Sequence, residues 1–330
     1  MKLLMILLAF VALGLLSACV HSAIYTSRVE AKYPPEGQLV PVNGADVHVI
    51  PAGTNGPVVL MIHGASANAS EFNYTLAPRL SDTHRVLMAD RPGHGYSDRP
   101  ADAETLQVQA AQMAGALDAL APNEKAVIVG HSFGGAVALR LALDYPDRVQ
   151  GLVLLAPVSH DWGGGGEAWY NKYAGSPVIG PIFSQLVPIV GPAQVKAGVN
   201  GVFFPKPAPD GYYEKSEIAL LFRPKEFRAN ARDVNALRAE MAAQQDRYPE
   251  IKVPVIVFSG AQDTVISPPL HVGKLKHQVD GLQIVKLPDG GHMPHHAYGA
   301  EAADAISQIA AGEPVSAEAL EASARARDTE

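Results

Sequence analysis

The segment of sequence that decides the fold is Ala126-Val127-Ile128-Val129-Gly130-His131-Ser132-Phe133-Gly134-Gly135. Its first four residues are apolar and mostly β-branched, which favours a buried strand, and this pattern ends at Gly130. Ser132 follows two residues later, and the helix-like stretch 136–143 comes after two more glycines. A G-x-S-x-G motif between a strand and a helix puts its serine on a sharp turn, where neighbours without a Cβ let the two elements approach closely. The sequence therefore predicts that Ser132 is a nucleophile at a helix N-terminus, where free N–H groups favour developing negative charge.

Short apolar runs alternate with helical patterns along most of the chain. The helical spacing of apolar residues is clearest at 104–121 and near 298–311. An Asn43-Gly44 pair between two alternating stretches predicts a hairpin before the first of the buried strands. This alternation is typical of an α/β fold, with a mostly parallel sheet covered by helices on both faces. The expected buried strands are 57–62, 85–89, 126–129, 152–155, 253–258 and 282–287.

The stretch 159–225 interrupts this alternation. It shows no clear buried strand, is rich in glycine, proline and aromatic residues, and holds both tryptophans of the chain. We expect it to form a helical lid inserted between two halves of the core, 38–158 and 226–312. Aromatic side chains on a lid above a catalytic serine favour a substrate with a hydrophobic moiety. Residues 313–330 have little apolar content and predict a frayed or disordered C-terminal tail.

The N-terminus has the pattern of a bacterial export signal. Lys2 precedes an apolar run, and Leu16-Ser17-Ala18-Cys19 resembles the lipobox of bacterial lipoproteins. We expect residues 1–18 to be removed as a signal peptide, leaving a lipidated Cys19 as the mature N-terminus and 19–37 as a tether. Two or more acyl chains on one cysteine hold a protein stably at a membrane.

The residue after Cys19 bears on where such a lipoprotein would go. Val20 stands where retention signals of the inner membrane usually have Asp, so the outer membrane is favoured in a bacterium with two membranes. The alternatives are cleavage and plain secretion, or an uncleaved anchor. Leu3 to Val20 is just long enough to span a bilayer.

Composition excludes several classes of partner and cofactor. Of the 330 residues 48% are hydrophobic and 18% charged, which fits one large globular domain with an insertion. The net charge of −7 and the pI of about 5.9 exclude an electrostatic footprint for nucleic acid. Cys19 is the single cysteine, so a lipid on it leaves no thiol for a disulfide or a metal thiolate.

A serine needs a base, and the base needs a carboxylate that orients it. His292 is the favoured base, because it follows the last expected strand and precedes the last helix; His295 and His296 are the alternatives. Asp263, directly after the preceding strand, is the favoured acid, and Asp161 is its alternative. The chain order serine, aspartate, histidine is the one expected for a nucleophile elbow on this type of sheet.

A tetrahedral oxyanion needs two N–H donors that are already in place. One is the backbone N–H of Phe133, the residue after the nucleophile. The other is expected from Ala65, in the loop after the strand 57–62. We expect structural rather than chemical roles for His63, for His131 and for the turn Asp90 to Gly95.

Taken together, these motifs resemble the α/β-hydrolases that carry a lid, a group that includes carboxylesterases, lipases, perhydrolases and C–C bond hydrolases. The resemblance spans Leu60 to about Ala311. Relatives with an aspartate nucleophile, the epoxide hydrolases and haloalkane dehalogenases, are disfavoured because position 132 is serine, and the HGGG loop of some lipases is absent. The matching motifs are HGAS at the oxyanion loop, DRPGHGYSDRP after the next strand, GHSFGG at the elbow, SGAQD at the acid and DGGHMPHH at the base.

We therefore expect a lipid-anchored serine hydrolase that cleaves an ester or a related acyl bond of a small-molecule substrate. Its chemistry requires neither a metal nor an organic cofactor. Two alternatives stay open. One is C–C bond hydrolysis or perhydrolysis by the same residues, and the other is a non-catalytic envelope protein that uses the fold for binding.

Overall fold

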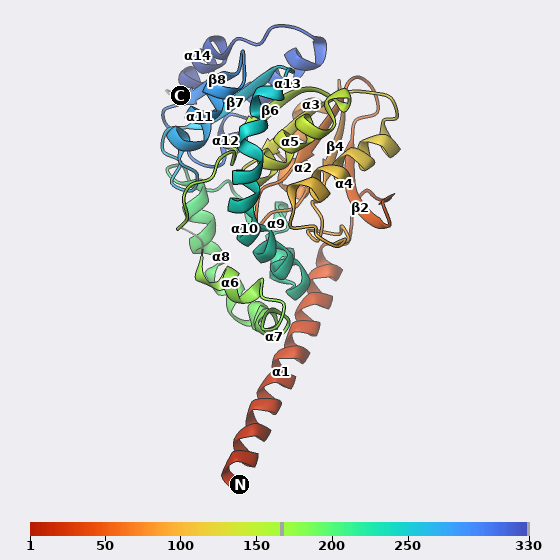
Figure 1. Ribbon diagram of the computed structural model, residues 1–330, viewed down its shortest axis with the longest axis vertical. Coiled ribbons are helices and arrows are strands. Elements are labelled where there is room, and N and C mark those ends of the chain that lie inside the picture. The colour runs from red at the N-terminus through yellow and green to blue at the C-terminus, as the bar shows by residue number, and fades with distance from the viewer. Residues whose placement is uncertain (166–167, 329–330) are drawn as a thin grey trace.

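The computed structural model describes residues 1–165 and 168–328, and this part of the chain forms one eight-stranded sheet surrounded by helices (Figure 1). The strand order is β1-β2-β4-β3-β5-β6-β7-β8. β2 pairs antiparallel with β1 and with β4, and all other neighbours are parallel. The strands are β1 Gln38–Val42, β2 Ala45–Ala52, β3 Val58–Ile62, β4 Arg85–Ala89, β5 Ala126–His131, β6 Val149–Leu155, β7 Val255–Gly260 and β8 Gln283–Leu287.

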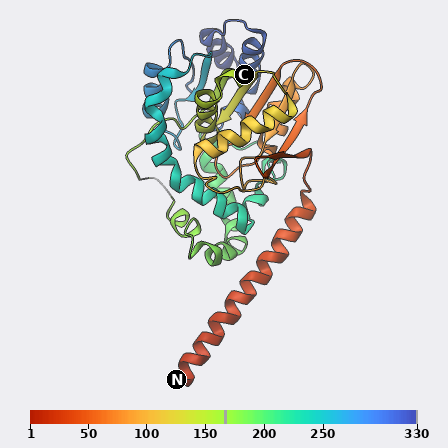
Figure 2. The same ribbon diagram turned by 45° about the vertical axis from the view of Figure 1, so that its right-hand side comes forward.

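The sheet separates two hydrophobic layers, and helices cover both. The helices are α2 Ser70–Asn73, α3 Ala77–Leu80, α4 Leu106–Leu120, α5 Phe133–Asp144, α10 Pro224–Gln244, α11 Lys274–Gln278, α13 Gly299–Ala311 and α14 Ala317–Asp328. α4, α5, α10 and α11 cover one face, and α2, α3, α13 and α14 cover the other (Figure 1 and Figure 2). In β3 alternate side chains enter opposite layers, and all five are buried. The predicted α/β fold, with a mostly parallel sheet flanked by helices, is confirmed.

β1 and β2 form the predicted hairpin at one edge of the sheet. Asn43 and Gly44 occupy its turn with φ of 51° and 81°. Two successive residues with positive φ are what a type I′ turn requires, and the twist of that turn matches the twist of the strands. Asparagine and glycine are the residues that adopt this conformation most readily.

The chain between β6 and β7 is helical, with no strand in its described residues 156–165 and 168–254. The helices of this segment that precede α10 lie together below the sheet in Figure 1. The expected lid, 159–225, comprises these helices; residues 166–167 lie outside the described part. α10 begins at the end of the lid and continues to the sheet, where Leu237 and Met241 join the first hydrophobic layer. The lid elements are α6 Trp169–Ala174, α7 Gly180–Phe183, η2 Ser184–Leu186, α8 Val187–Phe203, α9 Tyr212–Lys215 and η3 Ile218–Phe222.

The C-terminal tail is ordered as a helix, unlike the frayed or disordered segment that we expected. Residues 317–328 form α14, and residues 329–330 lie outside the described part. Leu320 and Ala324 are buried against the second hydrophobic layer. The carboxylate of Glu321 accepts a hydrogen bond from the backbone N–H of Lys286, in the edge strand β8, at 2.9 Å. α14 therefore covers a sheet edge that would otherwise be open to pairing.

α1, Lys2–Lys32, is a single helix that projects from the body of the protein (Figure 1 and Figure 2). It continues through most of the segment that we expected to be a tether. Its C-terminal half packs against α8, η2 and η3, and the Tyr25 hydroxyl donates to the carbonyl of Ala219 at 2.9 Å. Within the described residues, α1 is the one helix whose length and mean hydropathy of 2.8 suit a membrane span, a test that a signal sequence also passes.

Candidate active site

The predicted elbow lies between β5 and α5, and its backbone is strained at the serine. Ser132 has φ 52° and ψ −114°, a conformation that costs a residue with a side chain about 1–3 kcal/mol. The turn is tight because its neighbours are glycines. A Cβ on Gly130 would lie 2.5 Å from the carbonyl oxygen of Gly134, and one on Gly134 would lie 2.1 Å from that of Ile62.

Hydrogen bonds to the end of β6 hold the elbow in place. The N–H of Ser132 donates to the carbonyl of Leu155 at 3.0 Å, and the carbonyl of Ser132 accepts from the N–H of Val158 at 3.1 Å. The serine is 7% exposed. Its strained backbone is thus fixed on both sides by main-chain contacts, so the side chain starts from a fixed point at the carboxyl edge of the sheet.

His292 and Asp263 form a hydrogen-bonded pair at the same edge. Asp263 follows β7, His292 follows β8, and Nδ1 of the imidazole lies 2.8 Å from Oδ2 of the carboxylate. The other carboxylate oxygen accepts from the backbone N–H groups of Val265 and Ile266 at 2.8 and 2.9 Å. Because an ionised carboxylate only accepts hydrogen bonds, Nδ1 carries the proton and Nε2 keeps a lone pair. This is the tautomer that a general base requires.

Contacts through His131 and Gly64 bring these loops beside the serine. The imidazole of His131, which precedes the nucleophile, donates from Nε2 to the carbonyl of His292 at 2.9 Å, and the two rings lie 5.0 Å apart. Burial holds the pKa of His131 well below its usual value, so its ring is neutral. A Cβ on Gly64 would lie 3.2 Å from Cβ of Ser132. The elbow, the base loop and the oxyanion loop therefore adjoin one another.

Phe133 and Ala65, the two residues predicted to donate to an oxyanion, adjoin the elbow, and their role stays a prediction. Phe133 is the first residue of α5, and the N–H groups of a helix's first turn have no partner within the helix. Ala65 is half-buried in the loop after β3. The next residue, Ser66, has φ 59° and is held by Asn230 of α10, which accepts from its N–H at 2.7 Å and donates to its hydroxyl at 3.1 Å.

A buried arginine that we did not identify from the sequence supports the oxyanion loop. Arg91 donates to the carbonyls of His63 and Gly64, both at 3.1 Å, and pairs with Asp233 of α10 at 2.8 Å. Its guanidinium lies 4.2 Å from the centre of the Phe133 ring. His63 accepts from the N–H of Arg91 at 2.9 Å, and burial lowers the pKa of His63 to about 3. The geometry thus gives His63 a bracing role.

The turn that begins at Asp90 is held by the aspartate side chain. One carboxylate oxygen accepts from the N–H of Ala69 at 2.7 Å, and the other accepts from the N–H of Tyr96 at 2.9 Å and from the ring of His48 at 2.7 Å. These contacts join the turn to α2 and β2. All are scaffold contacts, as a structural turn requires.

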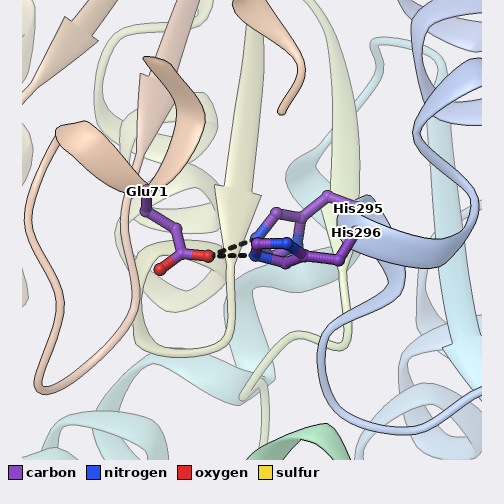
Figure 3. Close-up of side chains that lie close together, drawn as sticks. All are labelled: Glu71, His295 and His296. Atoms are coloured by element: carbon purple, nitrogen blue, oxygen red, sulfur yellow. Dashed lines mark hydrogen bonds and ion pairs between the residues drawn. The ribbon is translucent and has the colours of Figure 1, made fainter. Parts of the chain in front are cut away.

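The alternative acid and bases have other partners. Asp161 accepts from the N–H of Gly163 at 2.9 Å and so stabilises its own loop. His295 and His296 belong to α12, Pro294–Ala297, and both rings bind the buried carboxylate of Glu71 (Figure 3). Glu71 was not identified from the sequence, in which the adjacent histidines were the only sign of such a cluster.

A profile of the alpha/beta hydrolase fold family matches residues 57–297, which include the candidate residues Ser132, Asp263 and His292 and the loop after β3. The chain belongs to this family. The magnesium-chelatase 30 kDa subunit of Rhodobacter capsulatus is 30% identical over 272 residues, which are 81% of this chain and 90% of that subunit. The 2-hydroxymuconate semialdehyde hydrolase of Pseudomonas sp. (strain CF600) is 39% identical over 125 residues, which are 37% of this chain and 44% of that enzyme.

Among solved structures, a membrane phospholipase A superposes with a TM-score of 0.66 at 22% identity, over 94% of this chain and 99% of that one. This likeness shows the shared fold. The aligned part spans less than half of the Pseudomonas enzyme, so its activity does not transfer as a whole. The profile match over residues 57–297 therefore establishes the family and the fold of this chain.

Proposed function

We propose that this α/β hydrolase is a serine hydrolase that cleaves a carboxylic ester or a related acyl bond through an acyl-enzyme. The observation that carries the proposal is the 2.8 Å hydrogen bond between His292 and Asp263, set beside a serine with φ 52° at the end of β5. A strained serine, an oriented imidazole and a neighbouring loop with backbone donors are the parts that acyl transfer requires.

Each part has a defined role in the mechanism. Ser132 attacks the acyl carbon while Nε2 of His292 takes the hydroxyl proton, and Asp263 stabilises the resulting imidazolium. The N–H groups of Phe133 and Ala65 stabilise the tetrahedral oxyanion. His292 then gives its proton to the leaving group, and water, activated by the same imidazole, hydrolyses the acyl-enzyme.

The lid supports a substrate with a hydrophobic moiety at a membrane. Its large apolar residues are unusually exposed: 80% for Val178, 53% for Ile182 and 70% for Trp169. The lid packs against α1, whose Cys19 is exposed between the buried residues Ala18 and Ser22. An acyl chain on Cys19 and an uncleaved apolar helix would both hold the lid near a bilayer.

A fluorophosphonate probe tests the nucleophile. We expect the folded protein to be labelled at Ser132, and Ser132→Ala to lose the label and to lower kcat/KM by about 1,000-fold or more. Substitution of another serine near the elbow, Ser159→Ala, serves as the matched control and should keep the label. Labelling that persists in Ser132→Ala would contradict the assignment.

The anchor has its own test. If Cys19 is lipidated, a bacterial host fed an alkyne-tagged fatty acid should label the wild-type chain and not Cys19→Ser, and the mature protein should begin at residue 19. Intact mass measurement distinguishes the alternatives: an unlabelled full-length chain would indicate an uncleaved anchor, and an unlabelled shortened chain would indicate plain secretion.

C–C bond hydrolysis is the second candidate, favoured by the 39% identity to the 2-hydroxymuconate semialdehyde hydrolase over 125 residues. Short p-nitrophenyl esters compared with vinylogous diketones separate the two reactions. We expect higher kcat/KM on the esters, increasing with acyl-chain length. Higher kcat/KM on the diketones would instead support the C–C bond hydrolase.

A further inference from the structure

A second cluster of ligand-forming side chains lies behind the base loop. Glu71 projects from α2, and His295 and His296 project from α12, so that both imidazoles converge on one carboxylate (Figure 3). Nε2 of His295 lies 3.0 Å from Oε1 of Glu71, and Nε2 of His296 contacts the same oxygen. The proposed hydrolysis uses none of these residues.

The distances suit a small cation. One ligand atom from each of the three residues lies within 4.8 Å of the other two. Two ligands on a tetrahedral Zn²⁺ with bonds of about 2.0–2.1 Å are separated by about 3.3 Å, so small side-chain movements would complete the coordination. Two imidazoles and a carboxylate form a nitrogen and oxygen set that suits Zn²⁺ and similar divalent ions.

Burial and access also favour a metal. The side chains of Glu71, His295 and His296 are 1%, 0% and 4% exposed, and the other oxygen of Glu71 accepts from the Tyr212 hydroxyl at 3.1 Å. His296 also lines a cavity of about 200 Å³ together with Phe203 and other residues of the lid and base loop. The cavity provides a route of entry and room for a water as a further ligand.

An unpartnered nitrogen gives an independent indication. Nδ1 of His295 and Nδ1 of His131 are both buried and have no hydrogen-bond partner in the described part of the chain, although their rings lie only 4.7 Å apart. Because His131 donates from Nε2, its Nδ1 is an acceptor. A cation on Nε2 of His295 would move that ring's proton to Nδ1, the atom from which a metal-bound histidine normally donates its outer hydrogen bond.

We propose that Glu71, His295 and His296 bind one divalent transition-metal ion of the Zn²⁺ class. The ion would connect α2 of the core to α12, which follows the base loop, and Tyr212 would extend the connection to the lid. Its role is structural, because the three ligands are separate from the proposed nucleophile, base and acid. Metal binding therefore stabilises the fold and leaves the chemical step to Ser132 and His292.

Metal titration of the full chain in detergent tests this site. After treatment with a chelator, we expect wild type to bind one equivalent of Zn²⁺ or Co²⁺, with a higher Tm in the loaded form. His296→Gln should lower the affinity by about 100-fold or more, since changes to outer hydrogen bonds alone cost 10–100-fold. His277→Gln, which removes an exposed histidine of α11, is the matched control and should bind one equivalent.

Two further measurements keep the result decisive. Fluorophosphonate labelling of Ser132 shows whether each variant is folded. X-ray absorption of the Zn²⁺-loaded wild type should show imidazole nitrogens at about 2.0 Å, and this holds even if His296→Gln fails to fold. Folded wild type that binds no metal, metal without imidazole ligands, or equal binding by folded His296→Gln would overturn the proposal and leave a hydrogen-bonded cluster.

Discussion

In this α/β hydrolase, two histidines that are three residues apart, His292 and His295, each pair with a carboxylate. They differ in which ring nitrogen contacts the carboxylate. Asp263 binds Nδ1 of His292 at 2.8 Å, so Nε2, at the far end of the side chain, keeps its lone pair for a proton. Glu71 binds His295 through Nε2 at 3.0 Å, so that atom is occupied. An imidazole and a carboxylate therefore form a candidate base in one place and a fixed cluster in the other.

The largest expected effect comes from removing the charge that orients His292. Asp263→Asn leaves an amide whose N–H₂ favours the wrong imidazole tautomer, and kcat should fall by about 10,000-fold, as the equivalent change does in a serine protease triad. The free energy of unfolding should change much less. Steady-state kinetics with a p-nitrophenyl ester measures the loss.

Asp161→Asn is the matched control, because Asp161 is the acid that the sequence left as an alternative. Its carboxylate binds only within its own loop, to Gly163 at 2.9 Å, among the contacts of the described chain. We expect its kcat to stay within about twofold of wild type, well below the effect of a triad change. If kcat falls equally in Asp263→Asn and Asp161→Asn, the hydrogen bond from His292 to Asp263 does not determine which histidine acts as the base.

Replacement of the carboxylate by an amide at Glu71 should affect stability rather than catalysis. Glu71→Gln replaces a buried carboxylate that accepts from two imidazoles and from the Tyr212 hydroxyl. The free energy of unfolding should fall by about 1.5–3 kcal/mol, the range for hydrogen bonds to charged groups, while kcat stays within about tenfold. Urea denaturation with kinetics on the folded fraction separates the two; a triad-sized loss of kcat would give Glu71 a role in catalysis.

The sheet, and the positions of the three candidate residues at its edge, could be predicted because their signals are local. Each buried strand is a continuous apolar run, and Ser132, Asp263 and His292 each follow such a run directly. Because parallel strands align their carboxyl ends, order along the chain is enough to place these side chains at one edge. No long-range information was needed.

The partners that the sequence did not reveal are distant in the chain. Glu71 and His295 are 224 residues apart, and Arg91 and Asp233 are 142 apart, so no spacing rule connects them. The tail was misjudged for a related reason. α14 buries only Leu320 and Ala324, one helical turn apart, and its stability comes from covering the edge strand β8, which a sequence pattern does not show.

His63 differs from both His292 and His295, because its ring contacts no carboxylate of the described residues within hydrogen-bond distance and its effect should appear in the pH dependence of stability. Burial lowers the pKa of His63 from 6.5 to about 3, so the unfolded chain takes up a proton below pH 6.5 while the folded chain does not. The contribution of His63 to the free energy of unfolding is therefore fully present above pH 6.5. Below pH 6.5 the free energy of unfolding falls by about 1.4 kcal/mol per pH unit, or about 2 kcal/mol by pH 5. His63→Gln should show a shallower slope by that amount in denaturation at several pH values. The exposed control His277→Gln should keep the wild-type slope; unchanged slopes in both variants would show that His63 is not the group that titrates.

The smallest expected effect concerns the loop that presents Ala65. Asn230→Ala removes two hydrogen bonds to Ser66, at 2.7 and 3.1 Å, and so loosens a donor that acts mainly on the transition state. We expect kcat to fall about tenfold with KM nearly unchanged, and the free energy of unfolding to fall by about 1 kcal/mol. Asn235→Ala, one helical turn and a half further along α10, removes a 2.9 Å bond to the carbonyl of Asn171 in the lid and should show the stability loss alone. If both variants lose kcat equally, α10 affects catalysis through the lid as a whole, and the oxyanion loop has no separate dependence on Asn230.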